Sequence, residues 1–377
     1  MYRGILWHAT IALIAGALVA CAPAGEEDED SVIQAAGKRP TYEKVELAMK
    51  LTPLEQYDVN YHSTSQTTLM LEPNAEDGAA QRSVTGSTTI LDMMKVVSSG
   101  SLSEKGGLTQ TSQVSSFTMD KVQTADRETI QRTLILDDEG VRALANGEEE
   151  PLEPEEQTLV NALQASFTSR VDERGRQKRT GSAWDQLAKA KSSPMFPFLD
   201  WDRLTELVME LPEGEVSVGE PWERTVTLPL GDDELEVQVI WRLKEIVGED
   251  HEELALFAAQ ISGQAPEALK FKGTEGGVRY DTEVEKMTIA GSYSLVFDLD
   301  RGNYSSVDGD LTMNMALLIT TETGGETQQM RAIVDNSRMR ITAETIYDKA
   351  EGTINDDVES PIEDVEGTTE SKDVVEE

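Results

Sequence analysis

The most regular feature of the chain is an alternation of apolar and polar residues at every second position. It is clearest in residues 235–243, 293–299 and 311–319, and it recurs in the segment YDVNY at 57–61. The apolar members are Leu235, Val237, Val239, Trp241, Leu243, Tyr293, Leu295, Phe297, Leu299, Leu311, Met313, Met315, Leu317 and Ile319. This spacing places one face of a strand on a core and the other in water, which is typical of antiparallel sheets.

Residues that favour turns separate these segments. Asp308-Gly309 stands between two alternating runs and predicts a tight hairpin. The segments 172–175, 231–233 and 300–302 also carry Asp and Gly and predict further turns. Strands do not alternate with long helices, which argues against a parallel sheet. We therefore expect a mainly β, β-rich α+β fold, in which a few helices pack on curved antiparallel sheets or a half-open barrel.

Two segments have the pattern of helices that pack against a sheet. Pro154 opens the first, with Glu155 and Glu156 in the turn where the helix dipole favours acid. Its apolar stripe is Leu159, Leu163 and Phe167. The second begins at the N-cap Asp200 and ends at Pro212. Its stripe is Trp201, Leu204, Val208 and Leu211.

The N-terminus has the pattern of a secretory signal. In residues 1–20 an apolar run without acid follows Arg3, and the run is short for a membrane-crossing helix of about 20 residues. The alternative is an uncleaved N-terminal anchor helix. The segment Leu18-Val19-Ala20-Cys21 resembles the bacterial lipobox. That resemblance implies cleavage before Cys21, lipid on its thiol and an acylated amine, with palmitate among the expected acyl chains. Two or more chains anchor a protein stably.

The regions around the folded part are acidic. Residues 21–40 predict a lipidated N-terminus and tether, 41–350 a β-rich envelope domain, and 351–377 a disordered acidic tail. The element order also allows two related halves that meet near 181–212. Ala22, by resemblance to Gram-negative lipoproteins, favours the outer membrane. The chain is thus expected in the cell envelope, facing outside the cytoplasm.

Charge narrows the range of partners. The chain has 33 basic and 71 acidic residues and a net charge of −38. Nucleic acids and anionic membrane surfaces both require a basic patch, so we expect neither as a partner. Membrane contact is expected only through lipid on Cys21.

Four segments resemble an uncharacterised family of bacterial secreted proteins and lipoproteins. They are LTPLEQYDVNY, FTSRVDERGR, LPEGEVSVGEPWERTVTL and GSYSLVFDLDRGNYSSVDGDLTMNM, spread over residues 51–320. The most distinctive piece runs from Val216 to Trp222. The resemblance implies a β-rich envelope domain and supplies no activity or site residues.

Residues with catalytic or metal-binding chemistry are scarce. Cys21 is the only cysteine, so no disulfide forms within the chain. His62 is expected on the surface, and HEELA from His251 lacks the second histidine of a zinc-protease motif. Acids between Asp298 and Asp310 resemble a calcium loop, but Gly302 and Gly309 replace two needed ligands, so we interpret them as turn residues. We predict no catalytic residues, no metal site and no cofactor.

Three function classes remain open. The first is non-enzymatic binding of an apolar ligand or lipid, in a pocket lined by residues such as Leu295, Phe297, Met313 and Met315. SSPMFPFLDW at 192–201 would then form a hydrophobic lip, or else a loop fixed in the core. The second class is a structural lipoprotein that contacts another envelope protein. The third, a hydrolase, is the least favoured, because a nucleophile with a suitable base is missing.

Overall fold

The computed structural model describes residues 44–73, 83–103, 107–125, 128–191, 208–230, 233–248, 253–265, 269–275 and 278–347. Cys21, the signal, the tether, the 192–201 segment, His251 and the acidic tail lie outside these ranges, and what the sequence predicts for them stays a prediction. The described residues belong to one compact unit that ends at Tyr347.

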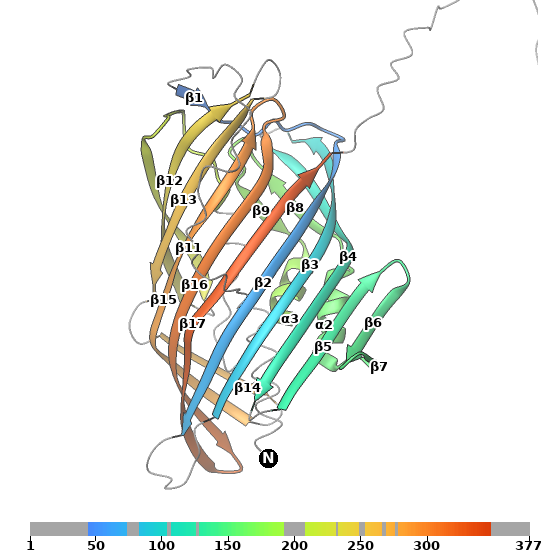
Figure 1. The fold of residues 1–377 in the computed structure, drawn as a ribbon, viewed down its shortest axis with the longest axis vertical. Helices are drawn as coiled ribbons and strands as arrows, with labels where there is room; N and C mark the ends of the chain where they lie inside the picture. The colour runs from blue at the N-terminus through green and yellow to red at the C-terminus, as the bar shows by residue number, and fades with distance from the viewer. Residues whose placement is uncertain are drawn as a thin grey trace, which may run out of the picture. The chain divides into compact units, whose positions relative to one another are not determined.

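Most of the described chain is one antiparallel sheet of fifteen strands (Figure 1). The first part of the chain contributes β2 (Gln56–Pro73), β3 (Ser83–Leu102), β4 (Leu108–Ala125), β5 (Glu128–Asp137), β6 (Gly140–Ala145), β7 (Glu148–Glu150), β8 (Phe167–Val171) and β9 (Gln177–Thr180). The second part contributes β11 (Pro221–Leu230), β12 (Asp233–Val247), β13 (Leu254–Gln264), β14 (Leu269–Glu275), β15 (Val278–Asp298), β16 (Asn303–Thr323) and β17 (Glu326–Ile346). A separate two-stranded sheet pairs β1 (Lys44–Glu46) with β10 (Glu215–Ser217). The expected mainly β fold is confirmed.

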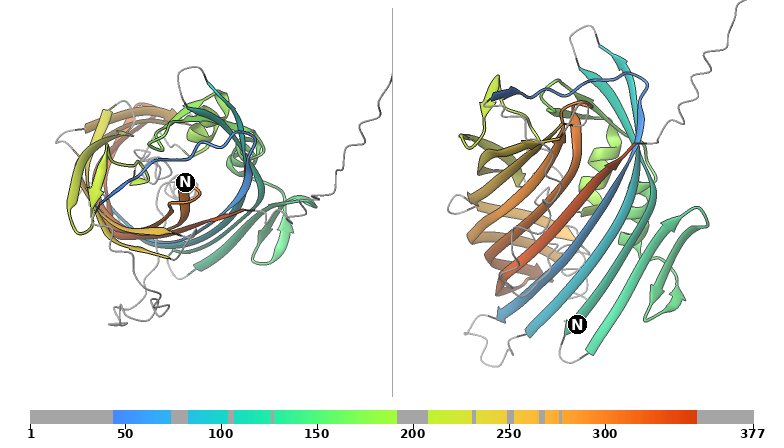
Figure 2. Two further views of the ribbon diagram at one scale, coloured as in Figure 1. Left: turned by 90° about the horizontal axis from the view of Figure 1, so that it is seen from above. Right: turned by 45° about the horizontal axis from the view of Figure 1, so that its top comes forward.

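The order of strands joins distant parts of the chain. It runs β11-β12-β13-β15-β16-β17-β2-β3-β4-β5-β6-β7, so the last strand lies beside the first long one. The β17–β2 ladder extends from Met330 opposite Pro73 to Ile346 opposite Asp58. The sheet curls strongly, and its end strands β11 and β7 do not pair with each other (Figure 2). Register shifts in five of the ladders accompany this curvature.

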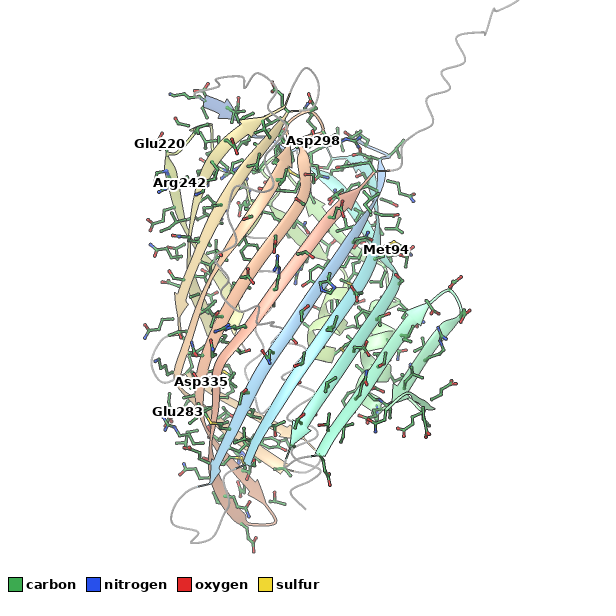
Figure 3. The ribbon with its side chains drawn as sticks, viewed as in Figure 1. Met94, Glu220, Arg242, Glu283, Asp298 and Asp335 are labelled. Carbon is green, nitrogen blue, oxygen red and sulfur yellow. The ribbon has the colours of Figure 1, made fainter. Side chains whose placement is uncertain are left out.

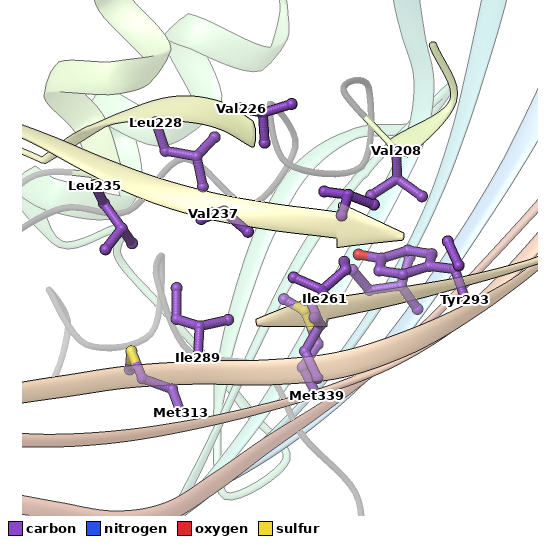
Figure 4. Close-up of a cluster of buried hydrophobic side chains, with 14 of the residues drawn as sticks. Val208, Val226, Leu228, Leu235, Val237, Ile261, Ile289, Tyr293, Met313 and Met339 are labelled. Atoms are coloured by element: carbon purple, nitrogen blue, oxygen red, sulfur yellow. The ribbon is translucent and has the colours of Figure 1, made fainter. Parts of the chain in front are cut away.

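The predicted alternation places apolar side chains on the inner face. The apolar positions of 235–243 and 311–319 are all buried, and so are Tyr293, Leu295 and Phe297. They form a large core on the β11–β17 side, part of which is seen in Figure 4. A smaller core includes Phe117 and Leu134 and is covered by the helices.

The outer face of the sheet is largely polar and carries ion pairs that join different strands (Figure 3). Arg331 on β17 lies 2.6 Å from Glu285 on β15, and Lys270 lies 2.7 Å from Glu283. One face of the sheet therefore packs on a core while the other is solvated, as the period-two pattern predicts.

The hairpin predicted at Asp308-Gly309 is wrong. β16 runs through both residues without a turn, and Gly309 lies directly opposite Tyr293 on β15. A Cβ at residue 309 would overlap the Tyr293 ring. The glycine is therefore present so that an aromatic ring can lie over the strand, and not to reverse the chain.

Two of the other predicted turns agree with the structure. β8 and β9 form a hairpin around 172–175, and β15 turns into β16 at 299–302. In the turn predicted at 231–233, residues 231 and 232 lie outside the described ranges. The first predicted helix is α2 (Pro154–Leu163), but Phe167 lies beyond its end, in β8. Helix α3 (Ser182–Lys191) was not predicted. Of the apolar stripe of the second predicted helix, only Val208 and Leu211 lie in the described ranges, and both are buried.

Within the described residues, none of the helices has the length and apolar character that crossing a bilayer takes.

An ionic cluster ties α2 to the inner face of the sheet. Arg132 on β5 donates two hydrogen bonds to Glu156, of 2.8 and 2.7 Å, and one of 3.0 Å to Glu150. Glu156 also closes the capping box of α2 by accepting from the backbone N–H of Glu153, at 2.9 Å. Lys121 on β4 lies directly opposite Arg132 in the β4–β5 ladder.

Burial of Lys121 gives a pH-dependent contribution to stability. Desolvation, opposed by Glu153 and Glu156, lowers the pKa of Lys121 to about 8. The unfolded chain keeps its proton to higher pH, so the contribution of Lys121 to stability rises between pH 8 and the pKa of a free lysine. We expect Lys121→Met to be more stable than wild type at neutral pH. The difference in free energy of unfolding between the variant and wild type should decrease by about 2 kcal/mol from neutral pH to about pH 9.5.

Urea unfolding of both proteins at the two pH values measures this gap. A gap that stays constant with pH would show that Lys121 titrates normally.

Candidate functional site: a cavity on the inner face

The four residues that the sequence predicted as the lining of a ligand pocket lie in the larger hydrophobic core and not at a cavity. Leu295, Phe297, Met313 and Met315 are each at most 5% exposed and belong to the larger core. None of them borders the cavity that lies on the same inner face. The alternation of apolar and polar residues correctly predicted which face of the sheet points inward. It did not predict where along that face a cavity is left.

The cavity forms where β4 changes its partner. β4 pairs with β5 along Phe117–Ala125 and with β8 along Leu108–Ser112. Side chains of β8, β9 and α3 form one wall of the cavity, and side chains of β16, β17, β2 and β3 form the other. The space between the two walls has a volume of about 190 Å³. The lining residues are Met49, Tyr57, Val59, Lys95, Val97, Gln110, Ser112, Ser169, Val171, Gly175, Gln177, Trp184, Met209, Asn303, Tyr304, Ser306, Val307, Ala343 and Thr345.

Strand register brings the sheet side of the cavity together. Tyr57 on β2 is opposite Val97 on β3, which is opposite Ser112 on β4. Two residues along, Val59 is opposite Lys95. Because alternate residues share a face, these side chains all project from the inner surface.

The opposite wall is held in place by Trp184 of α3. Its Nε1 donates a 2.9 Å hydrogen bond to the carbonyl of Thr168, and its ring centroid lies 4.8 Å from that of Phe167. The Arg179 guanidinium lies 4.4 Å from the centre of the Trp184 ring. Met49 and Met209 complete this side with flexible thioether chains, which adapt to irregular shapes.

One end of the cavity carries neutral hydrogen-bonding groups. Gln110 Nε2 donates to the Tyr57 hydroxyl at 3.1 Å, and Asn303 Nδ2 donates to the Tyr347 hydroxyl at 2.6 Å. The two tyrosine rings are 5.3 Å apart. Burial raises the pKa of Tyr57, although hydrogen bonds from Asn303 and Gln110 oppose this. Burial also raises the pKa of Tyr347. Both phenols therefore stay protonated at neutral pH and can donate.

The chemistry of the lining suits an amphipathic molecule. Valine, methionine and tryptophan side chains supply apolar contact, while a few hydroxyl and amide groups converge from β2, β4, β8 and β16. Among the lining residues, all of them in described ranges, Lys95 is the one with a charge. An apolar pocket with few, convergent polar groups is the usual form of a small-molecule site.

His62 lies on the outer face, as predicted. It shares that face with Asn60, and its side chain is 47% exposed. Its Nδ1 lies 2.7 Å from Asp92 Oδ1 and its Nε2 lies 3.1 Å from Thr64 Oγ1, partners that the sequence did not suggest. This chain of contacts resembles a nucleophile–base–acid arrangement. Thr64 lies in paired β2 on an exposed surface, however, which lacks the water-excluded donors of an oxyanion site.

The acids of the calcium-like segment bind backbone and arginine groups. Asp298 Oδ1 accepts a 2.8 Å hydrogen bond from the Arg301 N–H, and Asp300 Oδ2 accepts one of 3.0 Å from Glu253. Asp308 pairs with Arg340 at 2.9 Å. Within the described ranges, no group of three or more acidic, histidine or cysteine side chains could hold a metal ion.

Sequence reasoning missed the cavity because its residues are spread from position 49 to 345. One signal was available. In MKV at 94–96 and its neighbours, Met93, Lys95 and Val97 alternate on one face. A lysine within an apolar series marks a position where the inner face meets something other than core.

Comparisons with known proteins leave the chain without an assigned relative. No family model and no curated protein matches it. Among solved structures, it is similar to an outer membrane channel of Pseudomonas putida F1, at 8% identity and a TM-score of 0.20, over 79% of this chain and 97% of that one. It is also similar to Pseudomonas aeruginosa OpdH, at 7% identity and a TM-score of 0.17, over 78% and 99%. Scores this low carry no conclusion about this chain, so its function has to be argued from its own residues.

Proposed function

We propose that this protein is a lipid-anchored protein of a bacterial cell envelope, and that it binds an apolar ligand or lipid in the inner-face cavity without catalysing a reaction. The cavity carries this proposal, because its apolar walls and convergent polar groups leave open space on the same inner face that elsewhere bears the two hydrophobic cores.

The N-terminal sequence supports the location. The apolar run without acid, followed by Leu18-Val19-Ala20-Cys21, favours export and acylation of the thiol. Ala22 favours the outer membrane. The polar outer face of the sheet suits a domain in water beside a membrane, held by a tether.

Lining residue Val97 and its neighbour Val96 provide a matched test. Val97 borders the cavity, whereas Val96 lies on the outer face of the same strand. We expect the mature wild-type protein, extracted gently from its membrane, to carry a small non-covalent apolar molecule in native mass spectrometry. Val97→Phe should lose it because the ring occupies the cavity, and Val96→Phe should keep it.

A wild-type protein free of ligand that co-purifies with another protein would contradict the binding proposal. Cys21→Ala in the same preparations should accumulate as precursor without acyl label, and a variant that matures and labels would refute the anchor.

A second candidate function has one observation in its favour. Val84, Ile90 and Val122 are each at least 37% exposed and lie on the outer face of β3 and β4. Ile90 and Val122 are diagonal neighbours across the β3–β4 ladder, and exposed apolar side chains that adjoin on a sheet are typical of protein contacts. A structural lipoprotein that binds an envelope partner through this face is therefore the alternative, and co-purification in the experiment above would favour it.

A further inference from the structure

A row of small hydroxyl side chains runs along the inner face of β2. Ser63, Ser65 and Thr67 occupy alternate positions of this strand and are at most 6% exposed. Because alternate residues share a face, they project to the same side as Tyr57 and Val59, which line the cavity. This hydroxyl row is therefore a polar strip on a face that elsewhere bears the two hydrophobic cores.

The hydroxyl row begins beside the cavity. Ser63 is opposite Ile341 on β17, so the lining residue Ala343 is its diagonal neighbour across the β17–β2 ladder. Tyr61, which lies between Val59 and Ser63 on this face, is opposite Ala343 and is only partly buried. The single methyl group of Ala343 takes up little space. A ligand in the cavity that contacts Ala343 can therefore extend to Ser63.

The hydroxyl of Ser63 needs a hydrogen-bonding partner. Ser63 is 0% exposed, and its Oγ has no hydrogen-bond partner in the part of the chain that the structure describes. Thr67, at the other end of the row, differs, because its hydroxyl lies 3.0 Å from that of Ser337. Nearly all buried polar atoms in proteins bond to the protein, to ordered water or to a ligand. Ser63 is thus the position in the row where an atom from outside the chain can bind.

The surroundings of Ser63 favour an uncharged partner. Its direct and diagonal neighbours on β17 and β3 are all uncharged, namely Ile341, Leu91, Met339, Ala343, Thr89 and Met93. Burying an ion among them would cost far more than burying a hydroxyl or carbonyl oxygen. Lys95, the charged residue of the cavity lining, already interacts within the chain. A serine hydroxyl both donates and accepts, so an alcohol and an ester both suit it.

Resting on the proposed function, we infer that the ligand is an uncharged amphiphile, whose hydroxyl or carbonyl oxygen binds Ser63 and whose apolar part lies in the cavity. Met49, Val59 and Trp184 provide apolar contact for that part. A fatty alcohol and a monoglyceride have this chemistry. An alkane would leave the Ser63 hydroxyl without a partner, and a fatty acid anion would place its charge among the apolar neighbours of Ser63.

Three ligands test the inference: decanol, undecane, in which a methyl group replaces the hydroxyl, and decanoate. Binding to the full mature protein in lipid nanodiscs is measured by calorimetry, with empty nanodiscs as the blank. We expect decanol to bind about tenfold more tightly than undecane, because it pairs a buried hydroxyl. Decanoate should bind more weakly than decanol. Ser63→Ala should bind decanol and undecane equally, because the hydroxyl that distinguishes them is gone.

Ser337→Ala is the matched control. It makes the same change at a buried hydroxyl that already has Thr67 as its partner and lies outside the cavity lining. It should keep the preference of wild type for decanol, and circular dichroism should show both variants folded.

Each contrary result overturns a different part of the inference. A preference for decanol that persists in Ser63→Ala would overturn the assignment to Ser63. Tighter binding of decanoate than of decanol would overturn the uncharged class. Equal binding of decanol and undecane to wild type would overturn the hydrogen-bonded ligand and leave the cavity as an apolar site. Absence of binding by all three would overturn the proposed function as well.

Discussion

Arg132→Met is expected to destabilise the fold by about 3–5 kcal/mol, the usual result of removing one partner from a buried ion pair. Arg132 and Glu156 face each other with side chains only 9% exposed, joined by two hydrogen bonds. Arg132 Nη2 also donates to the Pro151 carbonyl at 2.9 Å. The variant leaves the buried Glu156 carboxylate without the cation that donates hydrogen bonds to it, and it removes the link between β5 and the start of α2. Urea unfolding, followed by tryptophan fluorescence, gives the free energy of unfolding.

The geometry supplies two controls for this experiment. Arg340→Met breaks a pair with Asp308 whose side chains are 51% and 44% exposed, so it should cost less than about 1 kcal/mol. The double variant Arg132→Met/Glu156→Met should recover much of the loss, because an apolar pair of similar volume replaces both charges. Equal losses for Arg132→Met and Arg340→Met would show that burial of the first pair is unimportant.

Gly309→Val is expected to cost about 3 kcal/mol, and Gly309→Ala roughly 1–3 kcal/mol, because any Cβ at this position meets the Tyr293 ring. Tyr293 is 1% exposed and lies in the larger core, so the ring has little freedom to move. Urea unfolding followed by tryptophan fluorescence gives the free energy of unfolding of both variants.

Gly86→Ala is the matched control for this pair of variants. Gly86 also lies within a long strand, β3, but nothing lies within 4 Å of a Cβ built there. It should be neutral or slightly stabilising, since alanine restricts the unfolded chain. If Gly86→Ala and Gly309→Ala lose the same stability, glycine serves only the backbone at both sites and the packing explanation fails.

The strands could be predicted from the sequence because their pattern depends only on neighbouring residues, whereas the role of a glycine can depend on another strand. Alternation in 235–243 and 311–319 predicted both the strands and their buried faces, because a period of two has one interpretation in an antiparallel sheet. Asp308-Gly309 was misread, because a glycine that admits an aromatic ring from the next strand looks the same in sequence as a glycine in a turn.

The candidate site could be predicted only in part. An apolar inner face was expected, but its open region depends on where β4 exchanges β5 for β8, and on α3, whose short polar sequence SAWDQLAKAK did not predict a helix. The strand pairing and the helix position depend on contacts between residues that are distant in sequence. The residues that line the cavity come from both ends of the chain, and no local pattern relates Tyr57 to Ala343.

The pairing of β2 with β17 has a consequence for how the chain reaches this structure. Residues near position 60 pair with residues near position 344. The centre of the sheet can therefore form only after the nearly three hundred residues between them have folded or have closed into a loop. Contacts so distant in sequence make folding slow. Until they form, the edges of two strands of 18 and 21 residues stay open to pairing with other chains. The step most exposed to aggregation is therefore the closing of this one ladder, and conditions that delay β17 should favour association of β2 edges over completion of the sheet.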